Sequence, residues 1–275
     1  MKQKLFVVGM MMLLIISCNL PSLATPTQQP AITFVPVATN TVDTGGVVTL
    51  NNVSFGLPLG VAQDALTEMV SATTDPNATA PWDLAPEHSK FTLTGYQVKD
   101  KFTEPQIFVY PAEEYAKLNS TAAEQIQRLK SILSGTPLTA NTTPRVPFYN
   151  AAQVFAAHMQ MVEFKTGRGV RFLTQYAQYP APINNHEMFY HFQGLTNDGK
   201  YYVIAILPVT SSILAEDEKP ESTVPAGGVA IPPDTGPNQA YYDAVVKALD
   251  AMYPDSFNPS LFQLDALIQS ITITP

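Results

Sequence analysis

Two consecutive stretches of β-branched and aromatic residues, each interrupted by a turn, constrain the fold most strongly. Residues 161–178 read MVEFKTGRGVRFLTQYAQ, with a turn expected at 166–169. Residues 186–209 read HEMFYHFQGLTNDGKYYVIAILPV, with a turn expected at 197–199, where glycine supplies positive φ. Two such hairpins in succession predict a four-stranded antiparallel meander at the centre of the fold.

Helical periodicity elsewhere makes the predicted fold class α+β, an antiparallel β-meander sheet covered by helices. Further strands are expected at 47–50, 53–55, 90–98 and 105–111. Apolar spacing predicts helices at 61–72, 112–119, 122–134, 150–160 and 239–253, and a last helix that runs into a short strand within 260–273. Together these elements predict one globular domain over residues 45–275.

Residues 1–17 have the layout of a secretory signal, with Lys2 and Lys4 before an apolar run and Ser17 at its end. The segment 15–18, Ile-Ile-Ser-Cys, resembles the lipobox of bacterial lipoproteins. That resemblance implies that Cys18 is diacylated and becomes the mature N-terminus. The alternative is an ordinary cleaved signal with an incidental cysteine. A membrane-spanning anchor is disfavoured, because the apolar run has only about 12 residues and a spanning helix needs about 20.

Residues 18–44 are rich in Pro and Thr and nearly free of charge, which is typical of an extended, disordered tether. Loss of Lys2 and Lys4 would change the formal net charge from −8 to −10, so nucleic acid is not an expected partner. Cys18 is the only cysteine, so the domain itself has no thiolate for a disulfide, a metal site or catalysis. No cofactor is predicted.

Two wider resemblances rest on longer segments. The opening VSFGLP, the meander and the closing LFQLDALIQSITI resemble the PsbP-like α/β sandwich fold, whose bacterial members are often exported lipoproteins. From residue 45 onward, the segments GVRFLTQYAQ, PINN and FQGLTNDGKYYVIAILPV also resemble uncharacterised bacterial lipoproteins. Neither resemblance implies a catalytic residue.

The segment His186-Glu187 followed by His191 invites comparison with a zinc-protease helix, which carries its histidines four positions apart. Here they are five positions apart, and on a strand an odd spacing places them on opposite faces. No metal site is therefore predicted from these histidines. Glu187 and His191 would share a face, and with Glu163 from the other hairpin they are the candidates for acid–base catalysis. A cross-strand hydrogen bond is the structural alternative.

Other motifs are weaker. The chain lacks a Gly-x-Ser-x-Gly elbow, and TGRGVR lacks the spacing of a phosphate loop. In the loop QYPAPINN, Asn184 and Asn185 are expected to cap strand ends or to clamp a ligand. On the second hairpin, the uncharged face of Met188, Tyr190 and Phe192 is predicted to pack against helices. The face of His191 is predicted to meet solvent or a neighbouring loop.

These features favour a non-enzymatic lipoprotein, lipid-anchored on the extracytoplasmic side of the cell membrane. Its partners would be the membrane, through the N-terminal lipid, and an unidentified protein or small ligand. The alternative is a cell-envelope hydrolase that uses Glu187 and His191.

Overall fold

The structure, a computed structural model, describes residues 44–75, 77–78, 80–219 and 221–274. The expected signal peptide (1–17), Cys18 and the expected tether (18–44) lie outside the described residues, apart from Thr44. No helix in the described ranges is both long and apolar enough to cross a membrane.

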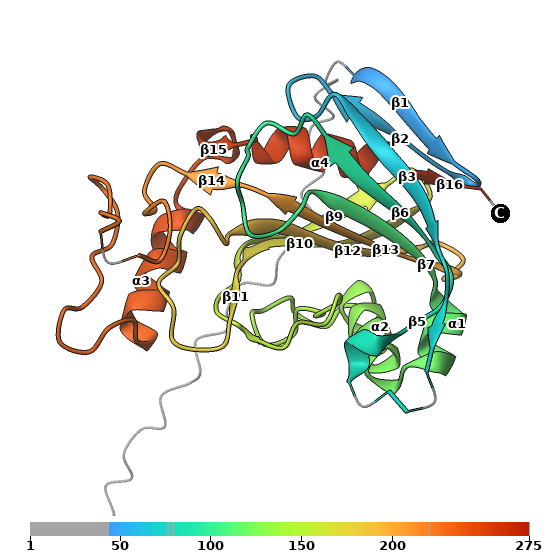
Figure 1. The fold of residues 1–275 in the computed structure, drawn as a ribbon, viewed down its shortest axis with the longest axis horizontal. Helices are drawn as coiled ribbons and strands as arrows, with labels where there is room; N and C mark the ends of the chain where they lie inside the picture. Colours follow the sequence, from blue (N-terminus) through green and yellow to red (C-terminus); the bar gives the residue numbers. More distant parts are fainter. Residues whose placement is uncertain (1–43, 76, 79, 220, 275) are drawn as a thin grey trace, which may run out of the picture. The chain divides into compact units, whose positions relative to one another are not determined.

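The centre of the fold is a seven-stranded sheet in the order β3-β6-β7-β13-β12-β10-β9, and every pairing in it is antiparallel (Figure 1). Its strands are β3 (Asp64–Val70), β6 (His88–Thr94), β7 (Gln106–Pro111), β9 (Ala157–Phe164), β10 (Gly167–Thr174), β12 (Phe189–Thr196) and β13 (Tyr201–Pro208). The predicted meander is confirmed, because β9, β10, β12 and β13 lie side by side in chain order. The α+β fold class is confirmed with it.

One face of this sheet is covered by helix α4 (Leu261–Ser270) and by a second sheet of β1 (Thr44–Leu50), β2 (Val53–Pro58) and β16 (Thr272–Ile273) (Figure 1). The last helix therefore runs into a short strand, as the sequence predicts. The side chains between these layers form the larger apolar core, which includes Phe192 from β12 and Leu264 from α4.

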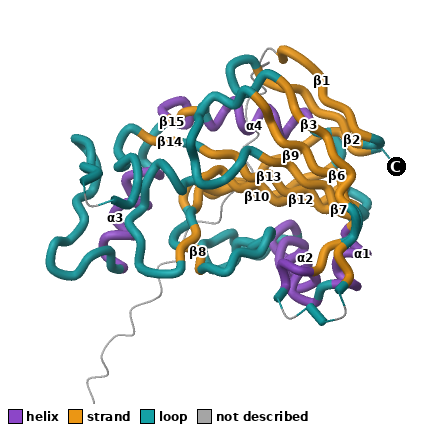
Figure 2. The backbone as a smooth tube through the Cα atoms, viewed as in Figure 1, coloured by secondary structure: helices purple, strands orange, loops and turns teal. Residues whose placement is uncertain are grey.

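The opposite face is covered by helices α1 (Ala112–Leu118) and α2 (Ser120–Leu133) and by the loop 134–151, which runs beneath the sheet toward β8 (Ala152–Gln153) (Figure 2). Residues three apart on α2, Ile126, Leu129 and Ile132, are buried against the sheet, as an amphipathic helix requires. Asn119 caps α2 by accepting a hydrogen bond from the backbone N of Ala122 (3.1 Å).

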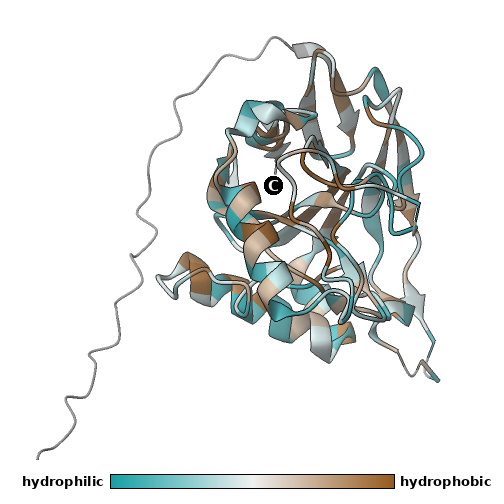
Figure 3. Cartoon of the chain, turned by 90° about the vertical axis from the view of Figure 1, so that its left-hand side faces the viewer, coloured by the Kyte–Doolittle hydropathy of each residue, from teal (hydrophilic) through white to brown (hydrophobic). Residues whose placement is uncertain are grey.

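Helix α3 (Gln239–Asp250) packs beside β9 and completes the larger core with Tyr241, Val245 and Leu249. Alternating hydrophobic and hydrophilic bands along the helices in Figure 3 show this amphipathic character. The remaining strands form short pairs or flank short 3₁₀ turns. The pairs are β4 (Thr73–Thr74) with β5 (Leu84–Ala85), β8 with β11 (Tyr176–Ala177), and β14 (Thr210–Ser211) with β15 (Phe257–Asn258).

Two predicted helices are wrong. Residues 61–72 contain strand β3, which pairs with β6 from Asp64 to Val70, and residues 150–160 contain β8 and the start of β9. The apolar spacing in both segments also fits a short helix, but pairing with a neighbouring strand decides the conformation. In β9 the strand is irregular at His158, where φ is 48° and the register with β10 shifts.

The first hairpin turns at residues 165–166 rather than at 166–169, since Gly167 and Gly169 belong to β10. These glycines serve close packing. A Cβ on Gly169 would lie 2.2 Å from the carbonyl oxygen of Gln193 on β12.

Both faces of β12 are buried. Tyr190 and Phe192 belong to the larger core, as predicted, but Phe189 and His191 on the other face are equally inaccessible, with exposed fractions of 1% and 0%. Of the two surroundings expected for His191, solvent is wrong and a neighbouring loop is confirmed, because the loop 134–151, together with the helices α1 and α2, covers that face.

Candidate functional site

His191 is a packed residue of the sheet. Its Nε2 lies 2.8 Å from the carbonyl oxygen of Val146, to which it donates, and its ring packs between those of Phe172 and Phe189 at 5.0 and 5.5 Å. Burial lowers the pKa of His191 to about 4, so the imidazole is neutral at physiological pH. His191 therefore has a structural role in the packed sheet and does not contact solvent.

Glu187 has a different environment. It precedes β12, in the turn at residues 185–187, and is half-buried. Its Oε2 accepts hydrogen bonds from Nε2 of Gln175 (2.6 Å) and Nδ2 of Asn184 (3.1 Å). Glu163 is exposed on β9 and lies opposite Arg168. The structure thus gives Glu163, Glu187 and His191 separate surroundings and does not assemble them into one acid–base group.

The turn that carries Glu187 is held by Asn184 and Asn185, which are both buried. The Oδ1 atom of Asn184 accepts from the backbone N of His186 (2.9 Å) and of Glu187 (3.0 Å). An asparagine side chain that bonds to the backbone two and three residues ahead stabilises such a turn. The side chains of His186 and Glu187 are therefore presented from a fixed backbone.

Asn185 joins this turn to the segment that follows β14. Its Nδ2 donates to the carbonyl oxygens of Ser211 (3.0 Å) and Leu214 (3.1 Å), and its Oδ1 accepts from the backbone N of Ser211 (2.8 Å). Its own backbone N donates to the carbonyl oxygen of Ala215 (2.9 Å). These bonds bring residues 216–219 beside the turn, so the asparagines fasten one loop to another.

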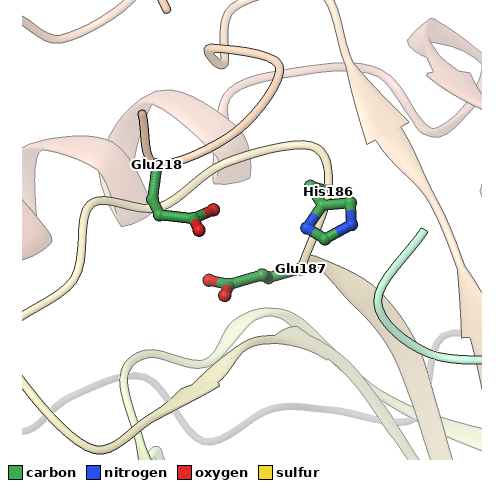
Figure 4. A group of neighbouring side chains, drawn as sticks. All are labelled: His186, Glu187 and Glu218. Atoms are coloured by element: carbon green, nitrogen blue, oxygen red, sulfur yellow. The ribbon is translucent and has the colours of Figure 1, made fainter. Parts of the chain in front are cut away.

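The result is a loop cluster of His186, Glu187 and Glu218, each of which places one donor atom within 4.8 Å of the others. Figure 4 shows the two carboxylates facing each other, with the imidazole ring beside them. Next to the cluster lies a pocket of about 300 Å³ lined by His186, Asp100 and residues 216–219.

The electrostatics of the loop cluster favour a positive ligand. Burial raises the pKa of Glu187, and the Glu218 carboxylate adds to this, while the hydrogen bond from Asn184 and the nearby His186 act in the opposite direction. Two lysines pair with other carboxylates that line the pocket: Lys101 with Glu216 (2.6 Å) and Lys219 with Asp217 (2.6 Å). In the part of the chain that the structure describes, Glu187 and Glu218 have no ion-pair partner.

No family model, curated protein or solved structure matches this chain. The sequence identified Glu187 as a candidate but paired it with His191. Glu218 was missed, because it lies in a long acidic, proline-rich segment where each carboxylate looks alike. Its contact with Glu187 depends on hydrogen bonds made by buried asparagines, which no spacing pattern reveals.

Proposed function

We propose that this chain is a lipoprotein anchored through Cys18 on the extracytoplasmic side of the cell membrane, where its domain binds a ligand or a partner. The anchor rests on the signal-like residues 1–17 and the lipobox-like segment that ends at Cys18. Diacylation would provide two acyl chains, which is the number needed for stable attachment.

The binding role is inferred from one observation, which is where the polar side chains with unpaired atoms lie in the fold. On the central sheet, His191 and Gln193 are fully buried, and Nε2 of each bonds to a backbone carbonyl, while Nδ1 of His191 has no partner among the described residues. The loop cluster differs because its buried polar atoms without partners in the described ranges lie beside a pocket. Fixed loops that present unpaired polar atoms beside a pocket are typical of ligand sites.

A second candidate is a cell-envelope hydrolase, and the raised pKa of Glu187 favours it, because perturbed carboxylates are common in active sites. The partner expected from the sequence, His191, is buried elsewhere in hydrogen bonds of its own. Such an enzyme would have to use Glu187 with groups of the loop cluster. Hydrolysis of ester, amide or glycoside substrates by the purified chain, abolished by Glu187→Gln, would favour this candidate.

Cell fractionation tests the anchor. The wild-type chain is expected in the membrane fraction after salt and carbonate washing, and Cys18→Ser is expected in the soluble fraction or as an unprocessed precursor. A Cys18→Ser protein that is processed and still resists the washes would contradict lipid anchoring.

A further inference from the structure

The loop cluster contains two unsatisfied buried atoms from different loops. Nδ1 of His186 and Oε2 of Glu218 are both inaccessible to solvent and have no hydrogen-bond partner among the described residues. A buried polar atom without a partner destabilises the folded state, because it has lost its hydrogen bonds to water. Two such atoms lie together here beside a pocket, where a single ligand would satisfy both.

The lysines near the loop cluster do not fill that role. The ammonium groups of Lys101 and Lys219 are held by Glu216 and Asp217. Asp217 is also bonded to the hydroxyl of Ser222, and these contacts lower its pKa to about 2. The neighbouring residues are thus paired with one another, and the loop cluster itself has two carboxylates and neither a lysine nor an arginine.

Hydrogen bonds from two neighbouring side-chain amides also fix the orientation of the Glu187 carboxylate. The amides of Gln175 and Asn184 both donate to Oε2 of Glu187, at 2.6 and 3.1 Å. Amides that hold a carboxylate in place resemble the outer shell of a metal site, where such partners fix the direction of a ligand. The backbone bonds of Asn184 fix the positions of His186 and Glu187 in the same way.

We propose that His186, Glu187 and Glu218 bind a divalent transition-metal ion, with zinc as the reference ion. This inference rests on the proposed binding function and names its ligand. One imidazole nitrogen and two carboxylate oxygens suit zinc, whereas magnesium and calcium prefer oxygen alone. Three protein ligands leave a position for water or for a group of a further ligand.

To bind one zinc ion, the donor atoms of His186, Glu187 and Glu218 would have to move slightly closer together. Zinc–nitrogen and zinc–oxygen bonds are about 2.0–2.2 Å long, so ligand atoms around one ion lie about 3–4 Å apart. The donor atoms of the loop cluster lie within 4.8 Å of one another. The three side chains would have to rotate toward one another to bring their donor atoms into range.

Zinc titration of the full-length chain in detergent, after removal of metal with EDTA, tests the proposal. One zinc ion per chain is expected, with a rise in the melting temperature. Glu218→Gln, Glu187→Gln and His186→Ala are each expected to weaken zinc binding at least tenfold. Glu221→Gln is the matched control, because it removes one negative charge from an exposed position on the same loop and should bind zinc like the wild type.

Three results would overturn the proposal: no stoichiometric zinc, equal binding by Glu218→Gln and the wild type, or equal weakening in the Glu221→Gln control. Displacement of zinc by an excess of magnesium or calcium would overturn the assignment to a transition metal. Metal-free circular dichroism of each variant separates loss of the site from loss of the fold. Cys18→Ser should bind zinc normally, so the anchor and the metal site can fail independently.

Discussion

Arg171 on β10 and Asp265 on α4 form an ion pair in which both side chains are almost completely buried, with exposed fractions of 2% and 5%. Nε of Arg171 lies 3.3 Å from Oδ1 of Asp265, and the same oxygen accepts a hydrogen bond from the hydroxyl of Tyr190 (2.8 Å). The guanidinium also donates to the carbonyl oxygen of His158 and to Gln160. This network ties the last helix to the middle of the meander.

Removing one partner of this ion pair should lower the stability of the folded protein. Asp265→Leu leaves the guanidinium buried without a counter-charge and is expected to lower the free energy of unfolding by about 3–5 kcal/mol in urea titrations. Adding Arg171→Met removes the stranded charge and should restore part of that loss. If the double variant loses as much as the two single variants combined, the two residues are not coupled.

The buried His191 predicts a specific pH dependence. Its folded-state pKa of about 4 lies below the ordinary value of 6.5, so the folded protein binds fewer protons than the unfolded chain. The stabilisation from the neutral imidazole is therefore complete above the unfolded pKa and is lost as the pH falls from about 6.5 to 4, by about 3 kcal/mol.

His191→Leu removes this titration but also the hydrogen bond to Val146. The variant should be less stable than the wild type at neutral pH, and the difference should shrink in acid. Unfolding titrations at several pH values measure it. The buried His88 and the half-buried His158 are present in both proteins, so their titrations cancel in the comparison. A difference that does not change with pH would contradict the buried neutral state.

Phe192 has a fully buried ring that packs edge-on against Phe164, with 6.1 Å between the ring centroids. Phe192→Ala is expected to lower the free energy of unfolding by about 3–5 kcal/mol through the cavity that it leaves. Tyr253→Ala is the control, since 78% of that side chain is exposed, and it should change stability by less than about 0.5 kcal/mol. Similar losses in both variants would contradict the assigned core.

Gly169 packs its backbone against β12. Gly169→Ala would place a methyl group 2.2 Å from the carbonyl oxygen of Gln193, so the strands must shift, at an expected cost of about 1–3 kcal/mol. Gly46→Ala on β1 is the matched control, because nothing lies within 4 Å of its added Cβ. The melting temperatures of both variants make the comparison. An unchanged melting temperature for Gly169→Ala would mean that β10 and β12 are less tightly packed than described.

The sequence predicts the meander because its hairpins are local: β-branched and aromatic runs flank turns, and chain neighbours pair. The same holds for α1, α2, α3 and the closing helix, whose apolar stripes lie within one segment. The sequence predicts helices at 61–72 and 150–160 because a short apolar spacing fits either period. The strand partners of β3 and β8, which are β6 and β11, are not adjacent to them in the sequence.

The site was only partly predictable. Glu187 and Asn184 stood out, but Glu218 and the buried pair of Arg171 and Asp265 depend on contacts between distant segments. The alternation of β12 predicts that His191 meets solvent or a neighbouring loop, since an alternating strand usually has one exposed face. Here the loop 134–151 and two helices cover that face, and nothing in the local pattern of β12 reports it.

The mass of the mature N-terminal peptide, released by proteolysis of protein purified from the membrane fraction, tests the proposed role most directly. Lipid anchoring predicts that this peptide begins at Cys18 and carries a diacylglycerol group on its sulfur. A mature chain that begins at another residue, or that carries an unmodified Cys18, would contradict the proposal.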